Sequence, residues 1–272
     1  MGNKFARLGL PVVLVAAAAF LAACSTIYAS RSASSPYAAT AAGTPAPAGL
    51  GTQWGESRES RIVTVEVNRI TPNRPDDVAQ LFYNDADGVR ASVGNNSDRQ
   101  LNVLMAQGDV EWSVRDEADR PLTLERATQG ADKALNFVGR KGARYTLLFH
   151  NLSERVYEVV ATVDGLDVIN GQPGSTRHTG YVLYPRATLR IDGFRKNDFE
   201  VAAFRFSAVD RAYAANTPAG DARNVGVIGA ALFRLEIPAN RSALRDDAAL
   251  PPPNPFPAGR DPSYAPPPQY RK

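Results

Sequence analysis

Cysteine and histidine are scarce in this chain of 272 residues, which carries one cysteine, Cys24, and two histidines, His150 and His178. A single cysteine cannot form an intramolecular disulfide. The two histidines cannot share a helical turn, so the chain lacks the ligand spacing of a zinc site. We therefore predict neither a metal site nor a cofactor.

The chain also has no large excess of charge of one sign, because it contains 31 Lys and Arg residues and 28 Asp and Glu residues. Loss of residues 1–23, which hold Lys4 and Arg7 and no acid, would leave 29 basic residues against 28 acidic ones. A nearly neutral chain lacks the broad positive field that binding to phosphate backbones requires. We predict that nucleic acid is not a partner.

The N-terminal apolar run is too short to span a bilayer comfortably. Lys4 and Arg7 precede it, residues 11–20 form its Val- and Ala-rich centre, and Leu21-Ala22-Ala23-Cys24 end it. A basic start, a short apolar stretch and small residues at the cleavage point are typical of a secretory signal. Residues 21–24 resemble the lipobox of bacterial lipoproteins.

The lipobox resemblance implies that residues 1–23 are a removed signal peptide and that the Cys24 thiol carries a diacylglyceryl group. The new amino terminus would be acylated as well, commonly with palmitate. Acyl chains hold a protein on a membrane because each buried methylene contributes about 0.8 kcal/mol. Ser25 stands where lipoproteins of the inner membrane often carry Asp, which favours the periplasmic face of the outer membrane. A buried free thiol or an intermolecular disulfide would not explain why Cys24 follows Ala23.

Composition divides the rest of the chain into three parts. Residues 24–60 are mostly small or polar, with Trp54 as the one large aromatic late in the stretch, and they are predicted to form a disordered tether. Residues 61–240 are long enough for one hydrophobic core. Residues 241–272 are Pro-rich and are predicted to be a disordered tail. The tail is either a spacer or recognition strand for an envelope partner, or a solvated end without a role.

Apolar residues recur with a period of two between these ends, which predicts β-strands. Asp164-Gly165 and Asn170-Gly171 are strong hairpin signals. Helix is expected only as a turn or two within residues 75–82 and 207–215. We predict a mainly β domain, an antiparallel β-sandwich or an open barrel. The strands are expected within residues 62–67, 101–105, 110–114, 122–124, 144–150, 155–163, 188–192, 199–206 and 225–237, of which the last two are apolar on both faces and therefore central.

Four short motifs lie between residues 144 and 233. They are Gly180-Tyr181-Val182-Leu183, Gly193-Phe194-Arg195, Ala202-Ala203-Phe204-Arg205-Phe206 and Asn224-Val225-Gly226-Val227-Ile228-Gly229-Ala230-Ala231-Leu232-Phe233. This stretch resembles a recurrent module of uncharacterised bacterial secreted proteins. The resemblance implies a transferable, β-rich unit and brings no activity with it.

Catalytic chemistry has little support in the sequence. A nucleophilic serine needs a base and an orienting acid, for which Ser175, His178 and Asp164 or Asp167 could be nominated, but no Gly-x-Ser-x-Gly elbow accompanies them. Asp164, Asp167 and Asn170 could donate oxygens to calcium, although their spacing is not that of an EF-hand loop. Asp and Asn are also common in turns, because they accept left-handed backbone geometry.

A basic and aromatic cluster lies within residues 177–196. Arginine forks beside aromatic rings suit carboxylate- or phosphate-bearing envelope polymers, including peptidoglycan stem peptides and lipopolysaccharide. The alternative is an ordinary outward strand face that Asp192 and Asp198 partly neutralise. The cluster predicted to contact a partner consists of Arg177, His178, Tyr181, Tyr184, Arg186, Arg190, Phe194, Arg195 and Lys196.

These observations together predict a lipid-anchored protein of the cell envelope with one β-sandwich-like domain. We expect it to act as a binding or assembly module without catalysis. The alternatives are a hydrolase or modifying enzyme that acts on the cell wall, and a structural subunit of a secretion or surface complex whose Pro-rich tail makes the contact.

Overall fold

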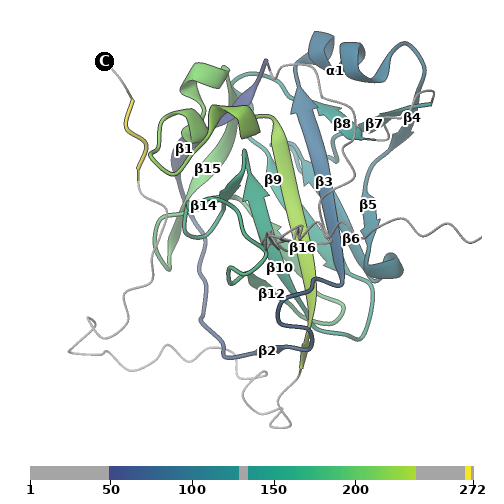
Figure 1. The fold of residues 1–272 in the computed structure, drawn as a ribbon, viewed down its shortest axis with the longest axis vertical. Coiled ribbons are helices and arrows are strands. Elements are labelled where there is room, and N and C mark those ends of the chain that lie inside the picture. Colours follow the sequence, from purple (N-terminus) through teal and green to yellow (C-terminus); the bar gives the residue numbers. More distant parts are fainter. Residues whose placement is uncertain (1–48, 129–133, 237–266, 271–272) are drawn as a thin grey trace, which may run out of the picture. The chain divides into compact units, whose positions relative to one another are not determined.

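Three β-sheets form the framework of the fold (Figure 1). This computed structural model describes residues 49–128, 134–236 and 267–270. The sheets confirm the predicted mainly β fold, and their strands pair mostly in antiparallel fashion. The predicted signal peptide, Cys24 and most of the Pro-rich tail lie outside the described residues.

The largest sheet has nine strands. Its order is β11-β10-β16-β3-β8-β7-β4, with β12 added beside β10 and β2 beside β16. The β3–β8 pair is parallel. Asp164 and Gly165 turn the chain between β10 and β11 with φ angles of 53° and 76°, as the Asp-Gly signal predicts. The strands are β2 (Asn68–Arg69), β3 (Asp77–Asn84), β4 (Ser97–Gln100), β7 (Leu124–Ala127), β8 (Leu135–Val138), β10 (Tyr157–Val163), β11 (Leu166–Asp167), β12 (Tyr181–Leu183) and β16 (Val227–Glu236).

Two smaller sheets complete the β structure. One has the order β13-β9-β6-β5, and the other has the order β1-β15-β14. The strands of the first are β5 (Val103–Met105), β6 (Val110–Arg115), β9 (Thr146–Asn151) and β13 (Thr188–Ile191), and those of the second are β1 (Gly51–Glu59), β14 (Gly193–Arg195) and β15 (Glu200–Ser207). The helices are α1 (Ala86–Val93) and the 3-10 turns η1 (Ala106–Gly108), η2 (Val209–Arg211), η3 (Tyr213–Ala215) and η4 (Ala222–Asn224).

One hydrophobic core joins the three sheets, which makes the fold sandwich-like. Trp112 of β6 stacks on Phe149 of β9 with ring centroids 5.5 Å apart, and both side chains are fully buried. Phe204 of β15 is also fully buried in this core, and Phe233 of β16 is fully buried in a second, smaller cluster with Val160 and Ala231. The prediction that these two strands are central is therefore confirmed.

The predicted tether is wrong at its C-terminal end, because residues 51–59 form β1 and pair with β15. Trp54 provides a large apolar side chain that packs against the core, which the composition of residues 24–60 as a whole does not indicate. Its ring lies 6.3 Å from the ring of Phe194 and 4.9 Å from that of Tyr213. Gly55 allows close backbone approach, since a Cβ atom there would lie 2.5 Å from the carbonyl oxygen of Ala203. The folded domain thus begins before residue 61.

Two of the predicted elements are wrong. Residues 62–67 form no strand, although their apolar alternation is the clearest in the chain. Of residues 75–82, expected to contain a helical turn, residues 77–82 belong to β3, because Leu81 enters the core and the strand pairs with both β16 and β8. The remaining predicted strands each overlap an observed one, and η2 and η3 confirm the short turns within residues 207–215.

Helix α1 was not anticipated. Asp85 caps its start by accepting a hydrogen bond from the amide of Gly88 at 2.8 Å, and Gly94 ends it with a φ of 76°. Four residues of the predicted tail, 267–270, are described. The amide of Gln269 donates to the carbonyl of Asn216 at 2.6 Å, and the Arg211 guanidinium lies over the Tyr270 ring.

Candidate functional site

The basic and aromatic cluster predicted at residues 177–196 does not form one exposed surface. Phe194 is fully buried, and Arg195 is 3% exposed. The Arg195 guanidinium donates to the Ser60 carbonyl at 2.5 Å and to the Tyr181 hydroxyl at 3.2 Å. Through these contacts, Arg195 links Ser60, which follows β1, to Tyr181 of β12. Phe194 and Arg195 are therefore structural and cannot contact a partner, which corrects the prediction for both.

The exposed cations of the cluster are mostly paired with acids outside it. Arg186 pairs with Glu154 at 2.8 Å, Arg190 with Asp119 at 2.6 Å, and Lys196 with Glu200 at 3.2 Å. Tyr181 and Tyr184 line a different hollow from the one that Arg190 lines. Arg177 is exposed and has no ion pair among the described residues. The nine residues are thus divided among several parts of the fold.

The histidines occupy unlike environments. His150 lies exposed on β9. His178 is half-buried, and its Nδ1 lies 3.1 Å from Oδ2 of the buried Asp167, so the acid–histidine half of the nominated triad is present. The hydroxyl of Ser175 accepts a hydrogen bond from the Arg177 amide at 3.2 Å. Asp164, the other nominated acid, belongs to a separate buried network.

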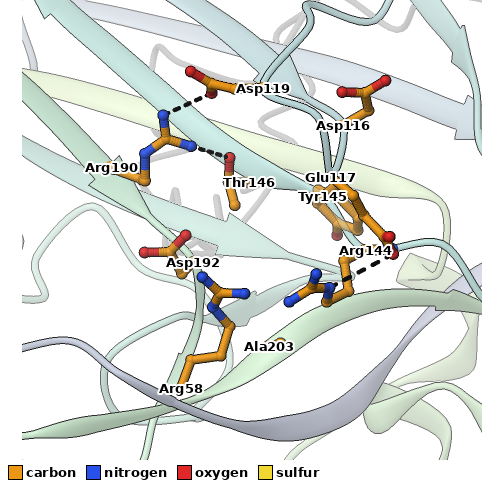
Figure 2. Close-up of a pocket in the computed structure, with 10 residues that line it drawn as sticks. All are labelled: Arg58, Asp116, Glu117, Asp119, Arg144, Tyr145, Thr146, Arg190, Asp192 and Ala203. Atoms are coloured by element: carbon orange, nitrogen blue, oxygen red, sulfur yellow. Dashed lines mark hydrogen bonds and ion pairs between the residues drawn. The ribbon is translucent and has the colours of Figure 1, made fainter.

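A hollow of about 310 Å³ opens where the two smaller sheets meet the turn after β6, and we call it the mixed-charge pocket (Figure 2). Its floor includes Tyr145, which is fully buried just before β9. The charged groups around it come from four stretches of the chain. They are Arg58, Asp116, Glu117, Asp119, Arg144, Arg190 and Asp192, with Tyr145, Thr146 and Ala203 between them.

The acidic turn on one side of the pocket is held by its own side chains. Asp116 Oδ1 accepts the amides of Ala118 and Arg120, each at 2.9 Å. Asp119 adopts a φ of 61°, a left-handed conformation that Asp tolerates. Hydrogen bonding from the Arg120 side chain lowers the pKa of Asp116. The turn therefore presents ionised carboxylates in a fixed arrangement.

Five of the seven charged residues in the pocket already have ionic partners. Arg144 bridges Glu117 at 3.5 Å and Glu56 at 3.3 Å. Arg190 also donates to the Thr146 hydroxyl at 3.1 Å, a contact that aims its guanidinium along the pocket wall (Figure 2). A hydrogen bond from the Arg144 amide is the main cause that lowers the pKa of Glu117.

Arg58 of β1 and Asp192, between β13 and β14, are the exceptions. Neither side chain makes an ion pair or hydrogen bond within the described residues, although both line the pocket. Figure 2 shows them on the same side of the hollow, with no dashed line between them. One guanidinium and one carboxylate are thus available to a ligand in a pocket whose other charges are satisfied.

Sequence reasoning named Arg190 and mentioned Asp192, but it missed Arg58 and the turn at residues 116–119. Arg58 was assigned to the tether. The run Asp116-Glu117-Ala118-Asp119-Arg120 was a usable signal, because a dense polar turn after a buried strand often carries function. Nothing in the sequence brings this turn next to residues 190–192, since only the pairing of β6 with β9 and of β9 with β13 does so.

A second polar group is enclosed in the core. The Asp164 carboxylate accepts hydrogen bonds from the Tyr83 hydroxyl at 2.5 Å, the Thr52 amide at 2.8 Å and the Gly226 amide at 2.9 Å. The Thr52 hydroxyl contacts the hydroxyls of Tyr83 and Tyr145. No cation faces the carboxylate in this network, and burial raises the pKa of Asp164 to about 6. The network joins β1, β3 and the β10–β11 turn.

Comparison with known proteins gives no match: no family model, curated protein or solved structure is similar to this chain. Within the described ranges, no three or more His, Cys, Asp or Glu side chains are grouped so as to hold a metal ion. None of the helices described is long and apolar enough to cross a membrane. The site must therefore be interpreted from its own chemistry.

Proposed function

We propose that this chain is a lipid-anchored protein of the bacterial cell envelope that binds cell-wall material through the mixed-charge pocket. The resemblance of residues 21–24 to a lipobox supports the anchor. The single observation that carries the binding role is the unpaired Arg58 and Asp192 in a pocket whose other charges are paired.

The balance of charge in the pocket favours a ligand that carries both signs. Three arginines and four acids line it, so a polyanion such as lipopolysaccharide would meet as much repulsion as attraction. Peptidoglycan stem peptides carry free carboxylates and amines on one short chain. A carboxylate would pair with Arg58, whose planar fork suits bidentate contact, and an ammonium would pair with Asp192.

The test compares binding of the full chain to isolated peptidoglycan sacculi and to lipopolysaccharide. Arg58→Gln and Asp192→Asn each remove one charge at nearly constant shape. We expect each to reduce retention on sacculi about three- to tenfold, since a charged hydrogen bond at a partly exposed site contributes about 0.7–1.4 kcal/mol. Arg186→Gln makes the same change in net charge as Arg58→Gln, but outside the pocket, and is the matched control for that variant. Equal retention of all three variants, or preference for lipopolysaccharide, contradicts the proposal.

A hydrolase of the cell wall is the second candidate, and the Asp167–His178 contact of 3.1 Å is the observation that favours it. An enzyme that uses this pair would release soluble fragments from sacculi, and His178→Gln would abolish that release. Retention without release, unchanged in the variant, supports the binding role instead.

A further inference from the structure

Residues 63–67 have the alternating sequence of a β-strand, but no described strand pairs with them. Their order is Val63-Thr64-Val65-Glu66-Val67, the clearest alternation in the chain. No backbone amide or carbonyl of these five residues makes a hydrogen bond within the part of the chain that the structure describes. We call them the unpaired segment.

The unpaired segment is held firmly at both ends. Before it, the buried Arg195 binds the carbonyl of Ser60, and the Ile62 amide donates to the Asp198 carbonyl at 3.0 Å. After it, Asn68 and Arg69 form β2 against β16. The Arg69 guanidinium bridges the buried Glu158 at 2.5 Å, donates to the His178 carbonyl at 2.5 Å and lies 3.7 Å from the centre of the Phe233 ring. Figure 1 shows the connection from β1 to β2 as a trace outside the arrows.

An apolar groove of about 460 Å³ lies between the unpaired segment and the edge of the largest sheet. Val65 and Val67 are half-buried toward it, and Val63 is 70% exposed. Tyr181 and Val182 of β12 form the other side, and among the described strands β12 pairs only with β10. Extended backbone with free hydrogen-bonding groups beside an apolar groove is the arrangement used for strand addition.

We propose that the unpaired segment receives an extended strand from a partner protein, which pairs with its backbone and places apolar side chains in the groove. This surface is separate from the mixed-charge pocket, so the proposal does not depend on the ligand proposed above. The charge of Glu66 indicates which residue the partner strand should carry opposite it. Glu66 is exposed, is the one charged residue of the segment and has no ionic partner within the described ranges. An incoming strand with Lys or Arg opposite Glu66 would complete a cross-strand ion pair.

A second copy of this chain fits less well. The segment contains no cation, and antiparallel pairing of two copies about Val65 places Glu66 opposite Thr64. The occupant is therefore a different polypeptide, with alternating apolar residues and a cation between them.

The experiment uses two synthetic peptides that alternate valine and threonine, one with a central lysine and one with a central glutamate. Binding to the full chain in detergent is followed by fluorescence anisotropy, and amide exchange of residues 63–67 by NMR. We expect the lysine peptide to bind about two- to fivefold more tightly than the glutamate peptide and to slow exchange in the segment. Glu66→Lys should reverse that preference, whereas the matched control Asp98→Lys on β4 should keep it.

Proline substitutions test the backbone contact. Successive amides of an extended strand point to opposite edges, so one of Thr64→Pro and Val65→Pro removes the amide that faces the partner, and the other does not. We expect one variant to lose peptide binding and the other to keep it. Both should melt like the wild type, because these amides make no hydrogen bond within the described residues. The proposal is overturned if neither peptide binds or slows exchange at about 1 mM, or if both proline variants bind normally. It is also overturned if the chain sediments as a dimer with these amides protected before any peptide is added.

Discussion

At the scale of single residues, burial separates the charged side chains that stabilise the fold from those that are available to a ligand. Arg195 and Glu158 are buried and Arg69 is half-buried, and each satisfies its polar atoms inside the protein. Such groups fix the positions of neighbouring segments, and a substitution at one of them would leave a partner uncompensated. Arg58 and Asp192 are accessible and unpaired among the described residues, so their charges remain available to ligands.

Asp164 gives a prediction at the same scale. Its folded pKa of about 6 lies above the ordinary 3.8, so the folded state binds the proton more tightly than the unfolded state. Its stabilising contribution is then fully present below about pH 4 and is lost as pH rises through about 6, by roughly 3 kcal/mol. Asp164→Asn should remove this part of the pH dependence.

The measurement is urea unfolding of wild type and Asp164→Asn between pH 4 and 8. The difference between the free energies of unfolding of wild type and variant should change across that range. The side-chain amide that the substitution introduces also faces the Thr52 N–H, which lowers the stability of the variant by the same amount at every pH and does not affect this change. The pKa values of Asp116 and Glu117 are lowered, so these carboxylates change stability with pH in the opposite direction. Their contribution is the same in wild type and variant and therefore cancels in the difference. A difference that is constant with pH contradicts the assignment.

At the scale of elements, β1 decides where the folded domain starts. It contributes the Trp54 ring and the Thr52 hydroxyl that contacts Tyr83 and Tyr145, and Leu50 directly before it is buried in the core. A chain that starts at residue 61 should therefore fail to fold cooperatively, whereas one that starts at residue 49 should fold. Thr52→Val should cost about 1–3 kcal/mol, because the buried Tyr145 hydroxyl loses its partner.

Near-ultraviolet circular dichroism and urea unfolding of the two truncated chains check this prediction. A cooperative transition of equal midpoint in both chains would show that β1 is dispensable. Thr52→Ser retains the hydroxyl and serves as the control for Thr52→Val.

The same elements show what sequence could predict. Strands with apolar residues on both faces, such as those containing Phe204 and Phe233, were found because burial leaves a strong local pattern. β1 was missed because its Gly, Ser and Thr residues resemble a linker and its strand character depends on pairing with β15. Residues 62–67 show the opposite case: the alternating pattern is present, but no described strand pairs with them. The mixed-charge pocket depends on contacts between distant strands, which no local pattern reveals.

At the scale of the whole molecule, the proposed anchor determines where both binding surfaces act. We predict that Cys24→Ala abolishes lipidation and membrane association, because the thiol is the only acceptor for the diacylglyceryl group. Cell fractionation and mass spectrometry of the amino terminus check it, with Ser25→Ala as the neighbouring control. A variant still cut before residue 24 and still found with membranes would contradict the lipobox assignment.

Binding of a zwitterionic wall peptide at Arg58 and Asp192 is tested most directly by calorimetry with soluble stem tetrapeptide. Three forms of the peptide are compared: unmodified, acetylated at its free amines, and amidated at its carboxylates. We predict that the unmodified peptide binds, that either modification weakens binding about three- to tenfold, and that Asp192→Asn removes the sensitivity to acetylation while Arg58→Gln removes the sensitivity to amidation. Equal binding of all three forms to wild type, or modification effects that survive in both variants, would contradict this account.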